Sequence, residues 1–177
     1  MTPDGLMVAA IEVADEGMDA GELPIGAVVA AGDEIIGRAY TQDQALGRRL
    51  VHADLLAMIE ADQRFGWRRC PQPLRLAVNL EPCLMCLGTA MVLGVTEVYF
   101  GLSSPADGGA GMAATWQPGN GTMPWFRAPT MVGGLRTDEI RDQFRRYCAT
   151  APESGFRSWA ATFVTESGRR ATGSRGT

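Results

Sequence analysis

One histidine and one pair of cysteines place the strongest constraint on how this chain can fold. His52 is the only histidine among the 177 residues, and Cys83 and Cys86 form a Cys-x-x-Cys pair about thirty residues further along. Zn²⁺ favours thiolate and imidazole ligands and usually takes four in a tetrahedron, so these three side chains leave one position open. An open position is typical of a catalytic zinc site, because structural sites are normally closed by four protein ligands. The fold must therefore bring the two short segments together around one metal ion.

Hydrophobic patterning places both metal-binding segments at the starts of helices. Apolar residues at helical spacing predict helices over residues 3–18, 51–64, 83–93 and 137–148. Short apolar or β-prone runs predict strands over residues 24–31, 34–40, 74–80 and 96–101. Strands that alternate with helices indicate an α/β fold with a mixed sheet. The two helix starts then lie on one side of the sheet, which brings the metal ligands together.

Length, apolar runs and charge narrow the class of protein. A chain of 177 residues without an uninterrupted apolar stretch of about 18 predicts one compact domain and no membrane span. The N-terminus has no signal-peptide pattern, and cysteines used as metal ligands suit a reducing compartment, so we expect a cytoplasmic protein. Residues 1–62 hold 12 acids and 3 arginines, whereas residues 63–177 hold 13 arginines and 8 acids. The acidic half argues against a large nucleic-acid footprint, and the basic half leaves room for a smaller one.

Several motifs together resemble one enzyme family. His52-Ala53-Asp54 followed by Pro82-Cys83-Leu84-Met85-Cys86 resembles the H-x-E…P-C-x-x-C pattern of zinc-dependent deaminases. Three further stretches of the chain resemble patterns of the same family. They are Gly21-Glu22-Leu23-Pro24-Ile25-Gly26-Ala27-Val28, Leu80-Glu81-Pro82-Cys83 and Val98-Tyr99-Phe100-Gly101. The chain thus resembles the cytidine deaminase-like superfamily over about residues 6–148, and within it the branch of tRNA-specific adenosine deaminases and guanine deaminases.

The resemblance implies a fold and a domain boundary. The expected fold is a three-layer α/β/α sandwich with a mixed central sheet. A deaminase domain is expected over residues 1–150, followed by a C-terminal extension over residues 151–177. Aromatic residues at 156, 159 and 163 predict one more packed element in the extension. Its Gly-, Arg- and Ser-rich end, residues 167–177, is expected to be disordered.

The same resemblance assigns roles at the site. It implies His52, Cys83 and Cys86 as ligands of one Zn²⁺, with Asp54 as the carboxyl group that moves protons between water, ring and leaving amine. The family has glutamate there, and aspartate is shorter by one methylene, about 1.5 Å of reach. Substrate contacts are expected from Ile25, Thr41 and Ala53. Thr41 stands where the family has asparagine, so bidentate recognition is lost, and Ile25 is interpreted equally well as a core strand residue.

The leading hypothesis is a zinc-dependent hydrolytic deaminase that acts on a small molecule: a nucleobase, a nucleoside or a related amino-heterocycle. The alternative is adenosine-to-inosine editing of tRNA, which the arginines of the predicted helix over 137–148 favour. Asp54 also motivates a third hypothesis, a non-catalytic zinc-bearing subunit. A closed structural zinc site would need a fourth ligand, for which Cys70 is the candidate. The resemblance further implies a homodimer.

Two segments depart from the family pattern. Arg48 and Arg49 stand in place of the residues that usually precede the metal histidine, and they could meet a phosphate or carboxylate or simply belong to a solvated loop. Residues 102–135 form a long Gly- and Pro-rich stretch that predicts a loop. Its aromatic residues Trp116, Trp125 and Phe126 either stack on a base or anchor the loop to the body, and both interpretations stay open.

Overall fold

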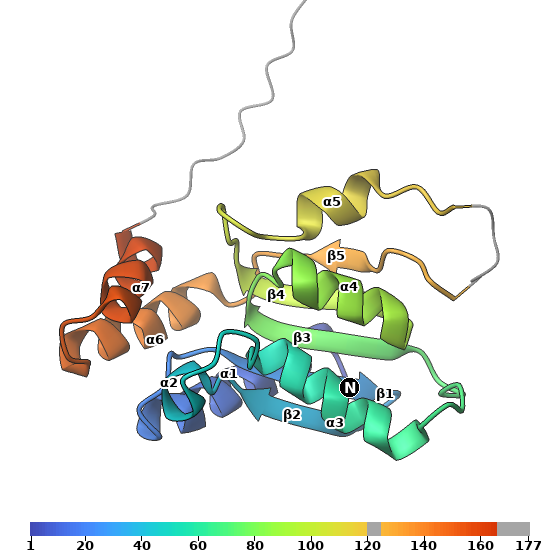
Figure 1. The fold of residues 1–177 in the computed structure, drawn as a ribbon, viewed down its shortest axis with the longest axis horizontal. Coiled ribbons are helices and arrows are strands. Elements are labelled where there is room, and N and C mark those ends of the chain that lie inside the picture. Colours follow the sequence, from blue (N-terminus) through green and yellow to red (C-terminus); the bar gives the residue numbers. More distant parts are fainter. Residues whose placement is uncertain (120–124, 166–177) are drawn as a thin grey trace, which may run out of the picture.

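A computed structural model describes residues 1–119 and 125–165, and within these ranges a five-stranded sheet is covered by helices on both faces (Figure 1). The strands follow the spatial order β2-β1-β3-β4-β5. Strand β1 pairs antiparallel with both β2 and β3, whereas β3, β4 and β5 run parallel, so the sheet is mixed. The strands are β1 (Gly26–Ala31), β2 (Glu34–Tyr40), β3 (Leu74–Leu80), β4 (Val95–Leu102) and β5 (Thr130–Val132).

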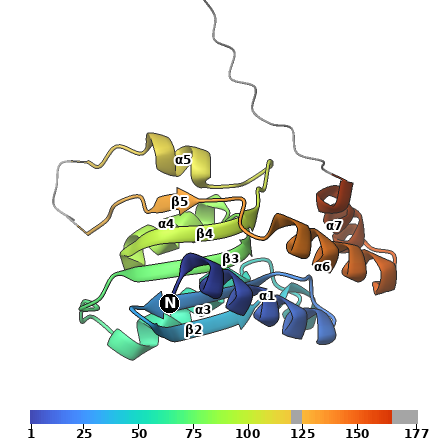
Figure 2. The ribbon, with the colours of Figure 1, turned by 180° about the vertical axis from the view of Figure 1, so that it is seen from behind.

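The helices form the two outer layers. One face of the sheet carries α3 (Ala53–Phe65) and α4 (Leu84–Leu93), and the other carries α1 (Pro3–Asp19) and α6 (Thr137–Thr150) (Figures 1 and 2). Successive residues of β1 alternate between the two cores: Val28 belongs to the α1 side and Val29 to the α3 side. The expected three-layer α/β/α fold is confirmed.

Glycines allow the helices to approach the sheet closely. A Cβ atom added at Gly37 of β2 would collide with the backbone carbonyl of Ala57 in α3. A Cβ atom added at Gly26 of β1 would collide with the backbone of α1 in the same way. The glycines therefore bring α3 and α1 against opposite faces of the sheet, and α3 begins with the metal motif.

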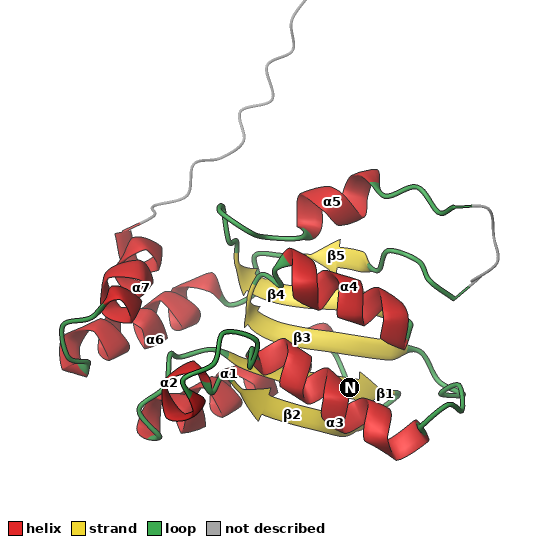
Figure 3. Cartoon of the chain, viewed as in Figure 1, coloured by secondary structure: helices red, strands yellow, loops and turns green. Residues whose placement is uncertain are grey.

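The region 102–135 is more regular than the sequence predicted. Its described part contains α5 (Ala110–Thr115) and β5, which pairs with the edge of β4 (Figure 3). The prediction of a long loop was wrong because β5 has only three residues and becomes a strand only through pairing with β4. Trp116 and Phe126 make an edge-to-face contact with ring centroids 5.7 Å apart, so these two rings of the stretch pack against each other.

Two short elements complete the described chain. Helix α2 (Asp43–Leu46) lies between β2 and α3, in a stretch expected to be loop. Helix α7 (Gly155–Thr165) packs against α6, where Ala160 and Phe163 are buried. The predicted disordered end, residues 167–177, lies outside the described residues. Across the part of the chain that is described, no helix is long and apolar enough to cross a bilayer.

Candidate metal and active site

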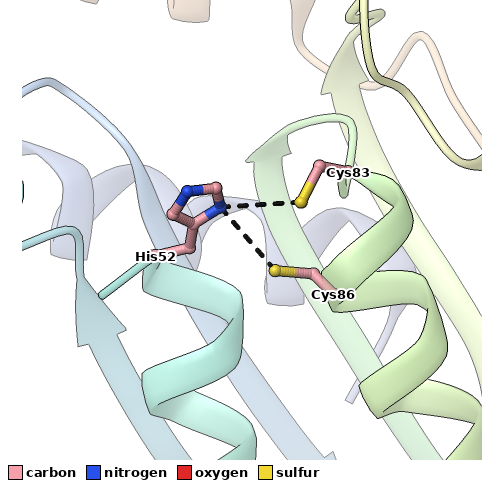
Figure 4. Close-up of side chains that lie close together, drawn as sticks. All are labelled: His52, Cys83 and Cys86. Atoms are coloured by element: carbon pink, nitrogen blue, oxygen red, sulfur yellow. Dashed lines mark hydrogen bonds between the residues drawn. The ribbon is translucent and has the colours of Figure 1, made fainter. Parts of the chain in front are cut away.

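Two helix starts bring the predicted metal ligands together. His52 is the N-cap residue of α3 and Cys83 that of α4, while Cys86 lies in the first turn of α4 (Figure 4). The His52 Nδ1 atom lies 3.6 Å from the Cys83 Sγ atom and 3.8 Å from the Cys86 Sγ atom. Tetrahedral zinc with Zn–N of about 2.0–2.1 Å and Zn–S of about 2.3 Å separates its nitrogen and sulfur ligands by about 3.6 Å. The three donor atoms therefore fit a zinc ion.

The group of possible metal ligands consists of His52, Cys83 and Cys86. Among residues 1–119 and 125–165, the His, Cys, Asp and Glu side chains gathered at metal-binding distance are these three alone, with donor atoms within 4.8 Å of one another. Cys70 is not part of the group, so the described chain offers no fourth ligand there. The arrangement is the open kind of site, with one coordination position left for water.

The three ligands also polarise one another. The hydrogen bond with Cys86 lowers the pKa of Cys83 to about 4, and the same bond together with burial raises the pKa of Cys86. The hydrogen bond to Cys83 raises the pKa of His52 to about 9. A metal ion binds these ligands in their deprotonated forms, so its binding releases protons from the group.

Asp54 lies in the first turn of α3, beside the ligands. Its side chain is only 4% exposed, and its Oδ1 atom accepts the backbone N–H of Leu55 at 3.1 Å. Burial raises the pKa of the Asp54 carboxyl, against the opposing effect of a hydrogen bond with Cys86. A carboxyl group with a raised pKa suits a step in which a proton is accepted and then given up near neutral pH.

His52, Cys83 and Asp54 line a cavity of about 980 Å³. The three expected substrate contacts, Ile25, Thr41 and Ala53, line it as well. Thr41 is buried, and its hydroxyl lies 2.5 Å from Asp43 Oδ2 and 3.2 Å from the carbonyl of Val51. The hydroxyl proton of Thr41 is therefore donated within its own loop, and Thr41 forms part of the cavity wall.

Two motif glutamates, to which the sequence assigned no role, hold the loops around the cavity. Glu22 is buried and accepts the backbone N–H groups of Gln44 and Ala45 at 3.0 and 2.7 Å. Glu81 accepts those of Ser104 and Ala110, both at 2.9 Å. Each carboxylate thus satisfies two backbone donors of a loop, which is a structural role.

The remaining carboxylates of the cavity are also engaged. Asp43 accepts the Thr41 hydroxyl, and the Asp107 Oδ1 atom accepts the Ser104 hydroxyl at 2.6 Å. Asp54 is the cavity carboxyl group that has a hydrogen bond to one of the metal ligands. Asp54 thereby differs from the other acids of the cavity, whose hydrogen bonds hold the surrounding loops.

The far side of the cavity differs from what the sequence suggested. Trp116, Trp125 and Phe126 are not among its lining residues, whereas Phe156 and Trp159 of α7 are. The aromatic spacing in the C-terminal extension had predicted only a packed element. Nothing in that spacing could show that α7 lines the same cavity as residues of α2 and α3.

An open site of one histidine and two cysteines, set at two helix starts of an α/β/α sandwich, is the arrangement of a catalytic zinc centre. The family model described as "Cytidine and deoxycytidylate deaminase zinc-binding region" matches residues 2–102. The chain therefore belongs to the cytidine and deoxycytidylate deaminase family, as the motifs predicted.

Relatives and solved structures agree with this family. The tRNA-specific adenosine deaminase of Bacillus subtilis is 40% identical over 113 residues, which are 63% of this chain and 69% of that protein. The tRNA(Ile)-lysidine synthase of Deinococcus radiodurans is 32% identical over 156 residues, but these are 26% of that longer protein. A solved structure from work on A-to-I editing by tRNA:A34 deaminases has a TM-score of 0.67 at 26% identity and covers 78% of this chain and 98% of its own. NE0047 in complex with 2,6-diaminopurine has a TM-score of 0.66 at 21% identity over 86% of this chain and 85% of its own, which shows the shared fold.

Proposed function

We propose that the protein is a zinc-dependent hydrolytic deaminase that removes the exocyclic amine of a nucleobase, a nucleoside or a related amino-heterocycle and releases ammonia. The observation that carries this proposal is the group of His52, Cys83 and Cys86 at zinc-binding distances beside the buried Asp54. His52, Cys83 and Asp54 line one cavity, and Cys86 lies behind them in the first turn of α4.

The proposed chemistry divides between the metal and the chain. Bound zinc would activate a water molecule for attack on the ring carbon that carries the amine. Asp54 would accept a proton from that water, give it to a ring nitrogen, and then transfer a proton to the departing ammonia. The apolar walls, including Ile25, would exclude other water from the ring. One water is consumed, one amine leaves, and the ring carbon gains an oxygen.

The shorter acid does not by itself mean loss of activity. Asp54 keeps its position in the first turn of α3 and its hydrogen bond with Cys86, and the ligand spacing is that of tetrahedral zinc. We therefore favour an active enzyme whose substrate sits deeper or has a different ring, rather than a non-catalytic subunit.

The experiment is ammonia release by zinc-quantified protein. The panel contains guanine, adenine, cytosine, their nucleosides, related amino-heterocycles and a tRNA anticodon stem-loop. Release from a small molecule that is lost in Asp54→Ala would support the proposal. Silence of the zinc-loaded wild type across the panel, with no gain in Asp54→Glu, would favour the non-catalytic subunit.

Editing of tRNA is the second candidate, because the B. subtilis relative has that name. The arginines of α6 that the sequence offered for RNA binding are paired with acids: Arg141 with Asp138, Arg145 with Asp142 and Arg146 with Asp15. These pairs leave little free positive charge on that face, which places editing second. Binding of a tRNA stem-loop that weakens steeply with salt would promote it.

Three further features follow the family pattern and are part of the proposal. Residues 1–150 would form the deaminase domain, with the extension 151–177 adding α7. The protein would be a cytoplasmic homodimer, and the exposed Leu84 and Val92 of α4 are candidates for its contact surface. Sedimentation equilibrium of the wild type and of Val92→Glu tests the dimer.

A further inference from the structure

Two adjacent, exposed arginines that line the cavity have no acidic partner among the described residues. Arg48 and Arg49 are exposed, line the cavity, and take part in no ion pair within residues 1–119 and 125–165. Other arginines of the body do have such partners: Arg38 pairs with Glu16, and Arg64 with Glu34. The unpaired guanidinium groups therefore offer positive charge to a ligand in the cavity.

An aromatic surface from α7 lines the same cavity. Phe156 and Trp159 lie one helical turn apart, and they remain 40% and 36% exposed. The ring of Trp159 lies 4.8 Å from that of Phe163 and 6.4 Å from that of Phe144, so it is fixed by the α6–α7 contact. A ring held in this way can stack on a ligand with little further loss of side-chain entropy.

The cavity is also large for a free base. Its volume of about 980 Å³ lies at the upper end of the roughly 300–1,000 Å³ typical of drug-sized ligands. A single heterocycle placed against His52 and Asp54 would fill only part of that space. The lining also includes the carboxylates of Asp43, Glu81 and Asp107, which accept hydrogen bonds within the protein, and the rings of Phe156 and Trp159. The guanidinium groups of Arg48 and Arg49 are the cationic groups of the lining, and a guanidinium group can bind a phosphate through two parallel hydrogen bonds.

We propose that the substrate carries a phosphate group beyond its reacting ring. Arg48 and Arg49 bind the phosphate, and the sugar or a neighbouring ring packs against Phe156 and Trp159. This proposal rests on the deaminase function proposed above and names the substrate class for the same site. The phosphate has two sources: a nucleoside monophosphate, or the phosphodiester backbone of a single-stranded oligonucleotide.

The first test compares kcat/KM for ammonia release from amino-nucleosides, their 5′-monophosphates and short single-stranded oligonucleotides. The phosphorylated substrates should be preferred by at least about tenfold, and Arg48→Gln/Arg49→Gln should remove that preference. Arg68→Gln/Arg69→Gln is the matched control, because Arg68 and Arg69 are also adjacent, exposed and without an ion pair in the described chain but do not line the cavity. Whichever phosphorylated arm is faster identifies the source of the phosphate.

Equal use of nucleosides and phosphorylated substrates would overturn the proposal, as would equal losses in the two double variants. A calorimetric binding measurement separates this failure from failure of the deaminase function. AMP, GMP and CMP should bind the zinc-loaded wild type more tightly than their nucleosides, more weakly at higher salt, and no better than the nucleosides in Arg48→Gln/Arg49→Gln. If none of the three binds more tightly than its nucleoside, the phosphate site does not exist, whether or not ammonia is released.

The second test concerns the aromatic surface. Phe156→Leu should raise KM for the preferred phosphorylated substrate by about tenfold and change kcat by less than about twofold, since stacking on an aromatic ring acts on binding. Trp159→Leu should act in the same direction, and Trp67→Leu, at a fully exposed ring outside the cavity, should change neither constant. An unchanged KM in Phe156→Leu with an unchanged melting temperature would refute the role of α7.

Discussion

Replacing Glu22 by glutamine tests how the loop beside the cavity is held. The Glu22 side chain is 1% exposed, and its two oxygens accept the N–H groups of Ala45 at 2.7 Å and Gln44 at 3.0 Å. Glutamine has nearly the same shape, but one of its two terminal groups is an NH₂ donor. That group would face a backbone N–H, so one partly buried hydrogen bond is lost and two donors point at each other.

The size of the effect follows from this count of hydrogen bonds. A hydrogen bond to a charged group contributes about 1.5–3 kcal/mol, and a buried donor left without a partner costs about 1–3 kcal/mol. We expect Glu22→Gln to lower the free energy of unfolding by about 2–4 kcal/mol. For a chain of this length, 1 kcal/mol corresponds to about 2–4 °C, so the melting temperature should fall by roughly 4–16 °C.

Thermal unfolding followed by circular dichroism measures this change, and Glu60→Gln is the matched control. The exposed Glu60 accepts one backbone N–H, that of Arg38 at 2.8 Å, so its loss should amount to less than about 1 kcal/mol. Because α2 lines the cavity with Asp43 and Gln44, Glu22→Gln should also raise KM. If Glu22→Gln melted within about 1 °C of Glu60→Gln, the two hydrogen bonds would not be what holds the loop.

Four further substitutions test the site and the packing. Asp54→Asn preserves shape but cannot carry the proton, so kcat for ammonia release should fall about 10²–10⁴-fold at unchanged zinc content measured by atomic absorption. Cys83→Ser removes a ligand, and the variant should lose its zinc on dialysis against a chelator that leaves the wild type loaded. Gly37→Ala should lower the melting temperature, because the added Cβ would collide with the carbonyl of Ala57 and overpacking costs about 1–3 kcal/mol. Gly88→Ala, where the added Cβ meets nothing within 4 Å in the middle of α4, should instead raise it by about 1–4 °C.

The sequence was sufficient for the elements that carry the metal site. Periodicity gave α3 and α4 to within two residues at either end, and it placed His52 and Cys83 at helix starts, where the structure has them as N-cap residues. The donor types then predicted the metal from known coordination chemistry. Both inferences depend on local pattern and on residue chemistry, which a single sequence contains.

Features that depend on contacts between distant segments could not be predicted. Strand β5 exists because three residues pair with the edge of β4, and no periodicity can be read from three residues. The aromatic residues of the extension have a helical spacing, but that spacing does not show that α7 reaches the cavity. The role of Glu22 is hidden for the same reason, because its partners lie 22 and 23 residues away.

The changes from the family pattern are not spread evenly over the molecule. The parts that build the site keep the pattern: three metal ligands, and two glutamates that hold the neighbouring loops. One cavity is lined by Thr41, Arg48, Arg49, Asp54, Phe156 and Trp159, which all depart from the pattern, whereas the aromatic residues of the departing 102–135 stretch do not line it. Loss of function would remove constraints on the ligands as readily as on the walls. Selection for another substrate would instead keep the metal ligands and change the acid and the walls of the cavity, which is the pattern found here. The shorter Asp54 is then one part of a reshaped binding site.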